Sequence, residues 1–268
     1  MRQLQAPMWA LALGAIVASP AAADRLDDVK ARGKLIVGVS DTTPPFTFKK
    51  DNSHAGYDID LVRAVAKRLG VAVETVSVSS AERIPMLKDG KLDFVATSMT
   101  RTPERLKDVD FSVIYFVTPH AVIVKKSSGI SSVQQLAGKK AASASTSTAG
   151  GNLKEAVPGV EIVYVRDYAI SFDMLKNGQV DAFPTDESVL RAIVLQDGHP
   201  NDYVFLRDFT KSRNVGFALK KDEPRFKDAI NKALLDVEAS GEAIKIFDAW
   251  FGPGSPEPMA RKFKIQAD

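Results

Sequence analysis

Short, mostly apolar runs alternate with amphipathic stretches along the first hundred residues of the chain. Leu35–Val39 has the pattern of a buried strand, and Val71–Val78 and Leu92–Ala96 continue the series. Asp58–Leu69 places its apolar residues on one helical face and is followed by Gly70, a residue type that commonly ends helices. This alternation of strand and helix predicts parallel sheets covered by helices.

Two further helix starts are signalled by capping residues. Ser79 or Ser80 can cap a helix over Ala81–Asp89, which Gly90 would end. The segment Thr102–Glu104 combines a capping residue with proline at the first helical position, so we expect another helix to open there.

An internal repeat is the most informative pattern in the sequence. Residues 86–94 (MLKDGKLDF) and 174–182 (MLKNGQVDA) share five of nine positions at an offset of 88. Each copy has the pattern of a helix end, a glycine stop and the start of a strand. Two unrelated helix–turn–strand units could produce the same pattern. Because type and spacing both match, we favour two lobes built on one plan.

The repeat also predicts where a binding site lies. Beyond its strand, the first copy continues to Ser98 and the second to Asp186. Ligands bind at the carboxyl ends of strands in open α/β sheets. Two such lobes facing each other would therefore present Ser98 and Asp186 to one shared cleft.

Composition narrows the class of function. The chain has 268 residues, of which 45% are hydrophobic and 26% charged, and a net charge of +3 without a basic run. This argues for a globular protein and against nucleic-acid binding. There is no cysteine, and His54, His120 and His199 have no spacing typical of metal ligands or a catalytic triad. We expect no metal and no cofactor.

The N-terminus has the pattern of a secretory signal peptide over residues 1–23. Arg2 supplies a positive charge, Met8–Ala18 is apolar, and Ala21–Ala23 offers a cleavage site before Asp24. The apolar run is too short to favour a membrane anchor. Without a cysteine the mature protein cannot be a lipoprotein. We therefore expect a free protein in the periplasm.

Several motifs in their order along the chain resemble those of family 3 solute-binding proteins, the periplasmic amino-acid receptors of ABC importers. The likeness covers roughly residues 33–251. Its main motifs are GVSDTTPPF (38–46), GYDIDL (56–61), TRTPER (100–105), DFS (110–112) and AWF (249–251).

The resemblance implies a two-lobed periplasmic-binding-protein (Venus flytrap) fold of the α/β class. Each lobe is a mainly parallel sheet flanked by helices, and the lobes share a two-strand hinge. Lobe 1 is expected to comprise residues 24–117 and 217–268, and lobe 2 residues 118–216. The implied partners are a free amino acid and a membrane ABC permease, and the implied state is a monomer.

The resemblance assigns the two charges of an amino acid to Arg105 and Asp186. Arg105 matches the arginine that holds the α-carboxylate, for which its planar fork is well suited. Asp186 matches the lobe 2 aspartate that binds the ammonium group. Two alternatives remain: Arg105 as a solvated helix charge beside Glu104, and Asp186 as a helix cap.

Four hydroxyl side chains complete the expected head-group site. Ser98 and Thr100 would add donors from lobe 1, while Thr146 and Ser147 match the Gly-Thr-Thr motif of lobe 2, at a helix N-terminus. The sequence departs from that motif because Ser145 stands where glycine is expected.

Arg83 is the residue that suggests which side chain the ligand carries, because it could pair with a second carboxylate. Thr43 and Ser80 replace the aromatic clamp of many members, and the stretch Ser80–Arg83 resembles glutamate/aspartate receptors. That group also carries an arginine at Ser40, absent here, and a histidine where Tyr168 stands. We expect an acidic amino acid first, then asparagine or glutamine.

Two other classes of function stay open. The same fold hosts enzymes that resemble cyclohexadienyl dehydratase, but no nucleophile motif is present, and prephenate has no ammonium group for Asp186. We therefore expect that the protein is not an enzyme. The protein could also be the ligand-sensing partner of a membrane receptor.

Overall fold

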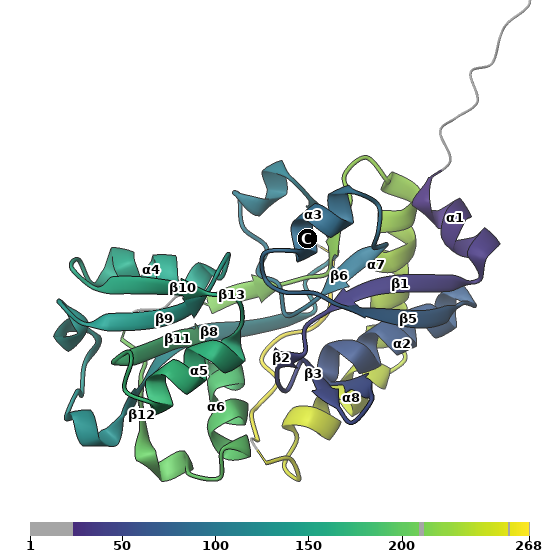
Figure 1. The fold of residues 1–268 in the computed structure, drawn as a ribbon. Coiled ribbons are helices and arrows are strands. Elements are labelled where there is room, and N and C mark those ends of the chain that lie inside the picture. Colours follow the sequence, from purple (N-terminus) through teal and green to yellow (C-terminus); the bar gives the residue numbers. More distant parts are fainter. Residues whose placement is uncertain (1–23, 209–211, 257, 268) are drawn as a thin grey trace, which may run out of the picture.

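The computed structural model describes residues 24–208, 212–256 and 258–267. The predicted signal peptide, residues 1–23, lies outside the described residues. Two lobes stand side by side, each with its own central sheet and helices packed against it (Figure 1). Within the described residues, no helix has the length and apolar character needed to cross a membrane.

The first lobe is built on a five-stranded sheet with the strand order β5-β1-β6-β14-β7. β1 pairs in parallel with β5 and β6, and β14 is antiparallel to β6 and β7. The strands are β1 (Lys34–Val39), β5 (Ala72–Ser77), β6 (Phe94–Ala96), β7 (Asp110–Phe111) and β14 (Ala218–Leu219). The helices are α1 (Arg25–Arg32), α2 (Tyr57–Leu69), α3 (Arg83–Lys88), α7 (Pro224–Ala239) and α8 (Glu242–Phe251). A small sheet adds β2 (Thr42–Thr43), β3 (Thr47–Lys50) and β4 (Ser53–Ala55).

The second lobe has the strand order β10-β9-β11-β8-β12, with β13 paired to β8. Its strands are β8 (Phe116–Lys125), β9 (Lys140–Ala144), β10 (Glu161–Val165), β11 (Ala182–Asp186), β12 (Tyr203–Leu206) and β13 (Ser212–Val215). Its helices are α4 (Thr148–Ala156), α5 (Tyr168–Lys176) and α6 (Glu187–Gln196). Single 3₁₀ turns cover Arg105–Lys107, Lys126–Ser128, Val133–Leu136 and Pro200–Asp202.

The two lobes repeat one supersecondary plan, as the sequence repeat predicts. β1-α2-β5-α3-β6 and β9-α4-β10-α5-β11 both place the first strand between the other two. Gly90 and Gly178 occupy the same left-handed backbone region, with φ of 73° and 72°. The repeat aspartates also act alike: Asp93 accepts a hydrogen bond from the Ile36 N–H at 2.6 Å, and Asp181 accepts one from the Lys140 N–H at 2.9 Å.

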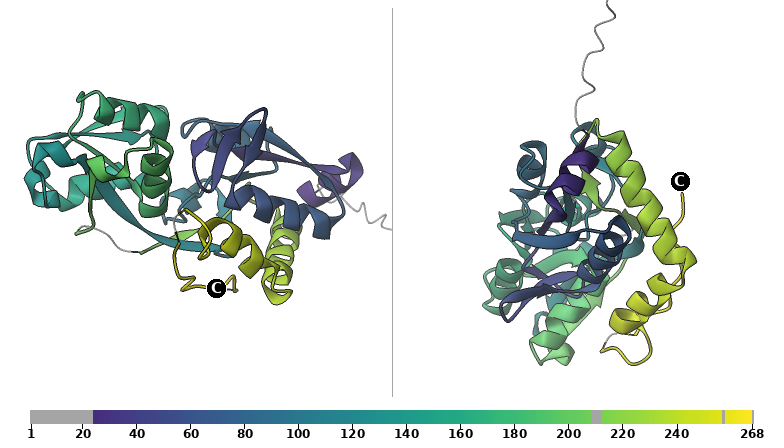
Figure 2. Two further views of the ribbon diagram at one scale, coloured as in Figure 1. Left: turned by 90° about the horizontal axis from the view of Figure 1, so that it is seen from below. Right: turned by 90° about the vertical axis from the view of Figure 1, so that its right-hand side faces the viewer.

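Two antiparallel strands join the lobes. β8 runs from the first lobe into the second sheet, and β13 pairs with its first residues in the register Asn214↔Val117 (Figures 1 and 2). β8 then continues between β11 and β12. The chain thus passes between the lobes through two strands that are hydrogen-bonded to each other, which is the arrangement of a hinge.

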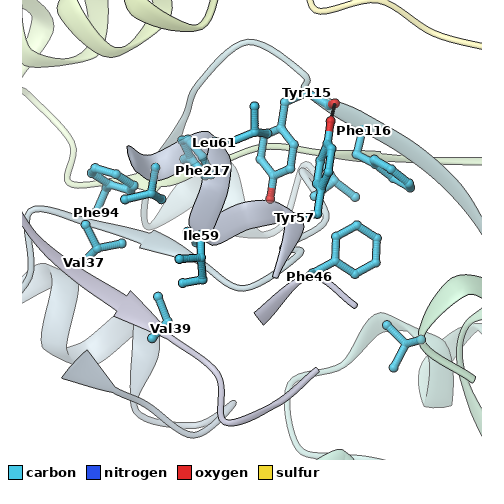
Figure 3. Close-up of a cluster of buried hydrophobic side chains, with 14 of the residues drawn as sticks. Val37, Val39, Phe46, Tyr57, Ile59, Leu61, Phe94, Tyr115, Phe116 and Phe217 are labelled. Atoms are coloured by element: carbon cyan, nitrogen blue, oxygen red, sulfur yellow. Dashed lines mark hydrogen bonds between the residues drawn. The ribbon is translucent and has the colours of Figure 1, made fainter. Parts of the chain in front are cut away.

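An aromatic cluster packs beneath this hinge. The rings of Phe46 and Phe116 meet edge to face with centroids 4.8 Å apart, and the ring of Tyr57 lies 5.3 Å from that of Phe116 (Figure 3). Phe263 of the C-terminal segment contacts Phe116 from another side, at 4.8 Å. The first residues of β8 are therefore anchored in the core of the first lobe.

Gly56 is required at the start of α2. Its φ is 134°, and a Cβ there would lie 2.0 Å from the Phe46 carbonyl oxygen. The same close approach lets the Tyr57 and Asp58 N–H groups donate to the Pro45 and Phe46 carbonyls. Two sequence motifs, 38–46 and 56–61, are therefore joined by backbone hydrogen bonds.

One predicted element is wrong in extent. The helix expected to open at Thr102 is the single 3₁₀ turn Arg105–Lys107. Thr102 Oγ1 does accept the Arg105 N–H at 3.2 Å, but the N-cap position of this turn is Glu104. The chain then enters β7 at Asp110, so there is no room for further helical turns.

Candidate functional site

The carboxyl ends of the parallel strands in both sheets face one another. Ser98 follows β6, and Asp186 ends β11, as the repeat predicts. The Ser98 Oγ lies 3.5 Å from the Asp186 Oδ2, so residues 88 positions apart meet across the two lobes. Ser98 has a left-handed backbone, with φ of 48°, and its N–H donates to the buried Asp58 carboxylate at 2.7 Å.

Arg105 reaches from the first lobe to the second. Its Nη1 donates to the Thr100 carbonyl at 2.7 Å, and its Nη2 donates to the Thr146 carbonyl at 2.6 Å. Burial lowers the pKa of Arg105 to about 9, and the neighbouring arginines Arg83 and Arg213 add to that effect. A carboxylate beside Arg105 would relieve this unfavourable environment.

Arg83 lies on the first turn of α3 and is only 6% exposed. Its Nη1 donates to Thr97 Oγ1 at 3.1 Å and its Nη2 to Thr146 Oγ1 at 3.3 Å. The Nε of Arg83 is buried and has no hydrogen-bond partner. Burial lowers the pKa of Arg83, so a second under-satisfied cation faces the cleft.

Thr146 connects the lobes from the other side. Its hydroxyl donates to the Ser80 carbonyl at 2.7 Å, and its backbone has a positive φ of 63°. Ser147 caps α4 by accepting the Ala149 N–H at 3.3 Å. The left-handed position in this loop is thus Thr146, while Ser145, which replaces the expected glycine, has no such backbone requirement.

Two adjoining cavities occupy the cleft. The smaller is lined by Arg83, Ser98, Met99, Thr100, Arg105, Ser147, Thr148, Tyr168 and Arg213. The larger shares Arg83 and Tyr168 and is also lined by Thr43 and Ser80. Eight of the ten predicted site residues therefore line one cavity or the other. Asp186 and Thr146 line neither.

Asp186 is engaged by an arginine that the sequence analysis did not single out. Arg213, on β13, places its Nη1 2.8 Å from Asp186 Oδ1 and its Nη2 3.2 Å from Oδ2. Burial raises the pKa of Asp186, and the Arg213 guanidinium opposes that rise. The carboxylate stands at the N-cap position of α6, but its side chain makes no capping hydrogen bond.

His120 also contacts Arg213, beside Asp186. Its Nε2 accepts a short hydrogen bond from Arg213 Nη1. Burial lowers the pKa of His120 to about 2, and the positive charge of Arg213 adds to the effect, so the imidazole is neutral. Arg213 and His120 are 93 positions apart, and strand pairing brings them together. No local sequence pattern marks either residue.

The arrangement suits the binding of a small anion. Hydroxyls, main-chain groups and guanidinium groups surround the smaller cavity. Within the described ranges, no group of three or more metal-ligating side chains is found.

Comparisons with known proteins identify the family of the chain. Residues 35–253 match the model of the bacterial extracellular solute-binding proteins, family 3. The chain is 34% identical over 233 residues to the glutamine-binding protein of an ABC transporter of Bacillus subtilis (strain 168), covering 85% of this chain and 84% of that protein. It is 31% identical over 274 residues to the L-glutamate/L-aspartate-binding protein of Pseudomonas aeruginosa, covering 96% and 91%.

A solved structure shows the same architecture. The crystal structure of an ancestral amino acid-binding protein, a precursor of cyclohexadienyl dehydratase, superposes with a TM-score of 0.76. It is 34% identical, and the match covers 85% of this chain and 99% of that one. The family's description as extracellular implies a periplasmic or extracellular location. The chain belongs to the bacterial extracellular solute-binding proteins, family 3.

Proposed function

We propose that this protein is the periplasmic receptor of an ABC importer and that it captures an acidic amino acid between its lobes. Asparagine and glutamine are the second choice. The signal peptide over residues 1–23, the lobe boundaries at 117/118 and 216/217, and the monomeric state are parts of the same proposal.

The observation that carries this proposal is the pair Arg83 and Arg105 in one cleft. Both guanidinium groups line the smaller cavity, and each contacts Thr146 of the opposite lobe. A ligand with two carboxylates can meet both arginines at once. Arg105 is the proposed partner of the α-carboxylate and Arg83 that of the side-chain carboxylate, because charge-assisted pairing with arginine is strong and directional.

The hydroxyl groups complete the proposed contacts. Ser98, Thr100 and Ser147 line the smaller cavity with the arginines. Thr43 and Ser80 line the larger cavity and leave it polar, which disfavours a hydrophobic side chain. Tyr168, like Arg83, borders both cavities.

Closure of the lobes is the proposed signal to the permease. Ligand contacts to both lobes favour the closed state, since only closure completes them. Turnover is not part of the proposal: the cleft residues named here bind charge, and the curated relatives compared above are binding proteins.

A melting screen on ligand-stripped protein tests the proposal. The protein is partly unfolded, dialysed and refolded, and its unfolding temperature is measured with each of the twenty amino acids. We expect the largest rise with glutamate or aspartate, with a stabilisation of about 4 kcal/mol at about 1,000-fold excess over Kd. A larger rise with a hydrophobic or basic amino acid would contradict it. An Arg63→Gln variant, which alters an exposed arginine paired with Asp60, is the matched control.

A further inference from the structure

The Arg213–Asp186 ion pair occupies the place where a ligand ammonium is expected. Arg213 spans both oxygens of the carboxylate, at 2.8 Å and 3.2 Å, and Ser98 Oγ lies 3.5 Å from Oδ2. Asp186 is 1% exposed and borders neither cavity. A ligand in the cleft therefore meets the guanidinium of Arg213 in front of this carboxylate.

Arg213 is also fixed in position by residues other than Asp186. His120 Nε2, on β8, accepts from Nη1, and Thr148 Oγ1, on the first turn of α4, lies 3.4 Å from the same nitrogen. Asp186, His120 and Thr148 come from three elements of the second lobe. An ammonium group at Asp186 would have to compete with Arg213 for this carboxylate, and separating a buried ion pair carries a large free-energy cost.

The charge around the smaller cavity is strongly positive. Arg83, Arg105 and Arg213 line it, and no carboxylate does among the described residues. Even with Asp186 and Asp58 both ionised behind the surface, three guanidinium groups face two carboxylates, which leaves one positive charge. An α-ammonium in this cavity would meet cations, while a second carboxylate would be attracted.

We propose that the cleft binds small dicarboxylates that lack an amino group as readily as acidic amino acids, because Arg213 already supplies the positive partner of Asp186. This inference rests on the proposed function, namely capture of a carboxylate ligand between the lobes. It names a broader substrate class for that site: four- and five-carbon dicarboxylic acids in which the α-substituent is a hydroxyl, an oxo group or hydrogen.

Calorimetric titration of the ligand-stripped wild-type protein tests the inference. L-Glutamate is compared with 2-oxoglutarate and glutarate, and L-aspartate with L-malate and succinate. We expect at least one desamino acid to bind within ten-fold of its amino counterpart, or more tightly. If each amino acid binds more than ten-fold tighter than both of its desamino analogues, the inference is wrong and the proposed function stands. If none of the six acids binds, the inference is wrong and so is the proposed capture of an acidic amino acid.

An Arg213→Gln variant provides a second, independent measurement. Its amide is neutral and leaves Asp186 open to an ammonium group, so we expect the ratio of affinities to move toward the amino acid by at least ten-fold. An unchanged ratio would overturn the role given to Arg213. Arg63→Gln removes an exposed guanidinium elsewhere and serves as the control. If Arg213→Gln does not fold, the wild-type titrations decide alone.

Discussion

Asp58 beneath the ligand cleft is predicted to make the protein less stable as pH rises. The residue is fully buried in the second position of α2, and its Oδ2 accepts the Ser98 N–H at 2.7 Å. Burial raises the pKa of Asp58 to about 7, against an opposing effect of the Ser98 N–H and the Tyr115 hydroxyl, and the nearby Asp186 charge adds to the rise.

The direction of this pH dependence follows from the linkage between proton binding and folding. The folded protein holds the Asp58 proton up to about pH 7, whereas the unfolded chain releases it near 3.8, the ordinary value. The folded state thus binds more protons between these limits, and stability falls as pH rises through that window. A difference of about three pKa units corresponds to about 4 kcal/mol at about 1.4 kcal/mol per unit.

Denaturant unfolding of the wild type and of Asp58→Asn, each at a series of pH values from 4 to 8, measures this effect. Asparagine can still accept the Ser98 N–H but does not titrate. The free energy of unfolding of the wild type should fall by about 4 kcal/mol more than that of the variant over this range. Parallel pH profiles for the two proteins would refute the account of Asp58.

Three other substitutions test particular contacts. Gly56→Ala should lower the free energy of unfolding by at least about 3 kcal/mol in denaturant titrations, because its Cβ would clash with the Phe46 carbonyl; near-wild-type stability would contradict this. Thr146→Ala removes the hydroxyl that donates to Ser80 and should weaken ligand binding by about 1 kcal/mol, as measured by calorimetry, with unfolding unchanged. Arg83→Gln should lower the binding free energy of an acidic amino acid by about 2–5 kcal/mol and that of the corresponding amide, glutamine or asparagine, by less than about 1 kcal/mol. Equal losses in calorimetry would show that Arg83 does not contact a side-chain carboxylate.

Much of the fold could be predicted because it repeats. The glycine stop and the aspartate of each repeat copy are local features with a structural purpose: Gly90 and Gly178 turn the chain, and Asp93 and Asp181 fix the neighbouring strand. The offset of 88 residues therefore predicts that Ser98 and Asp186 share one cleft, and their side chains lie 3.5 Å apart. The length expected of the helix at Thr102 is wrong, because a capping residue indicates where a helix begins and carries no information on how long it is.

The inner face of the site could not be predicted in the same way. Arg213 is 27 positions from Asp186 and 93 from His120, and it reaches both through the pairing of β13 with β8. A lone arginine in a short strand normally points to solvent, and nothing local marks this one as buried. The family likeness assigns Asp186 to the ammonium group of a ligand. In the structure this carboxylate is already paired with the Arg213 guanidinium.

Titration of Arg105→Ala tests the central claim most directly. Calorimetry with the best ligand of the wild type, on ligand-stripped protein, compares this variant with the wild type and with Arg63→Gln. The account predicts one site per chain in the wild type and the control, and a loss of about 2–5 kcal/mol in Arg105→Ala, since a desolvated carboxylate loses its partner. Near-wild-type affinity in Arg105→Ala, with the fold intact, would show that the cleft between the lobes does not bind the ligand in the way described.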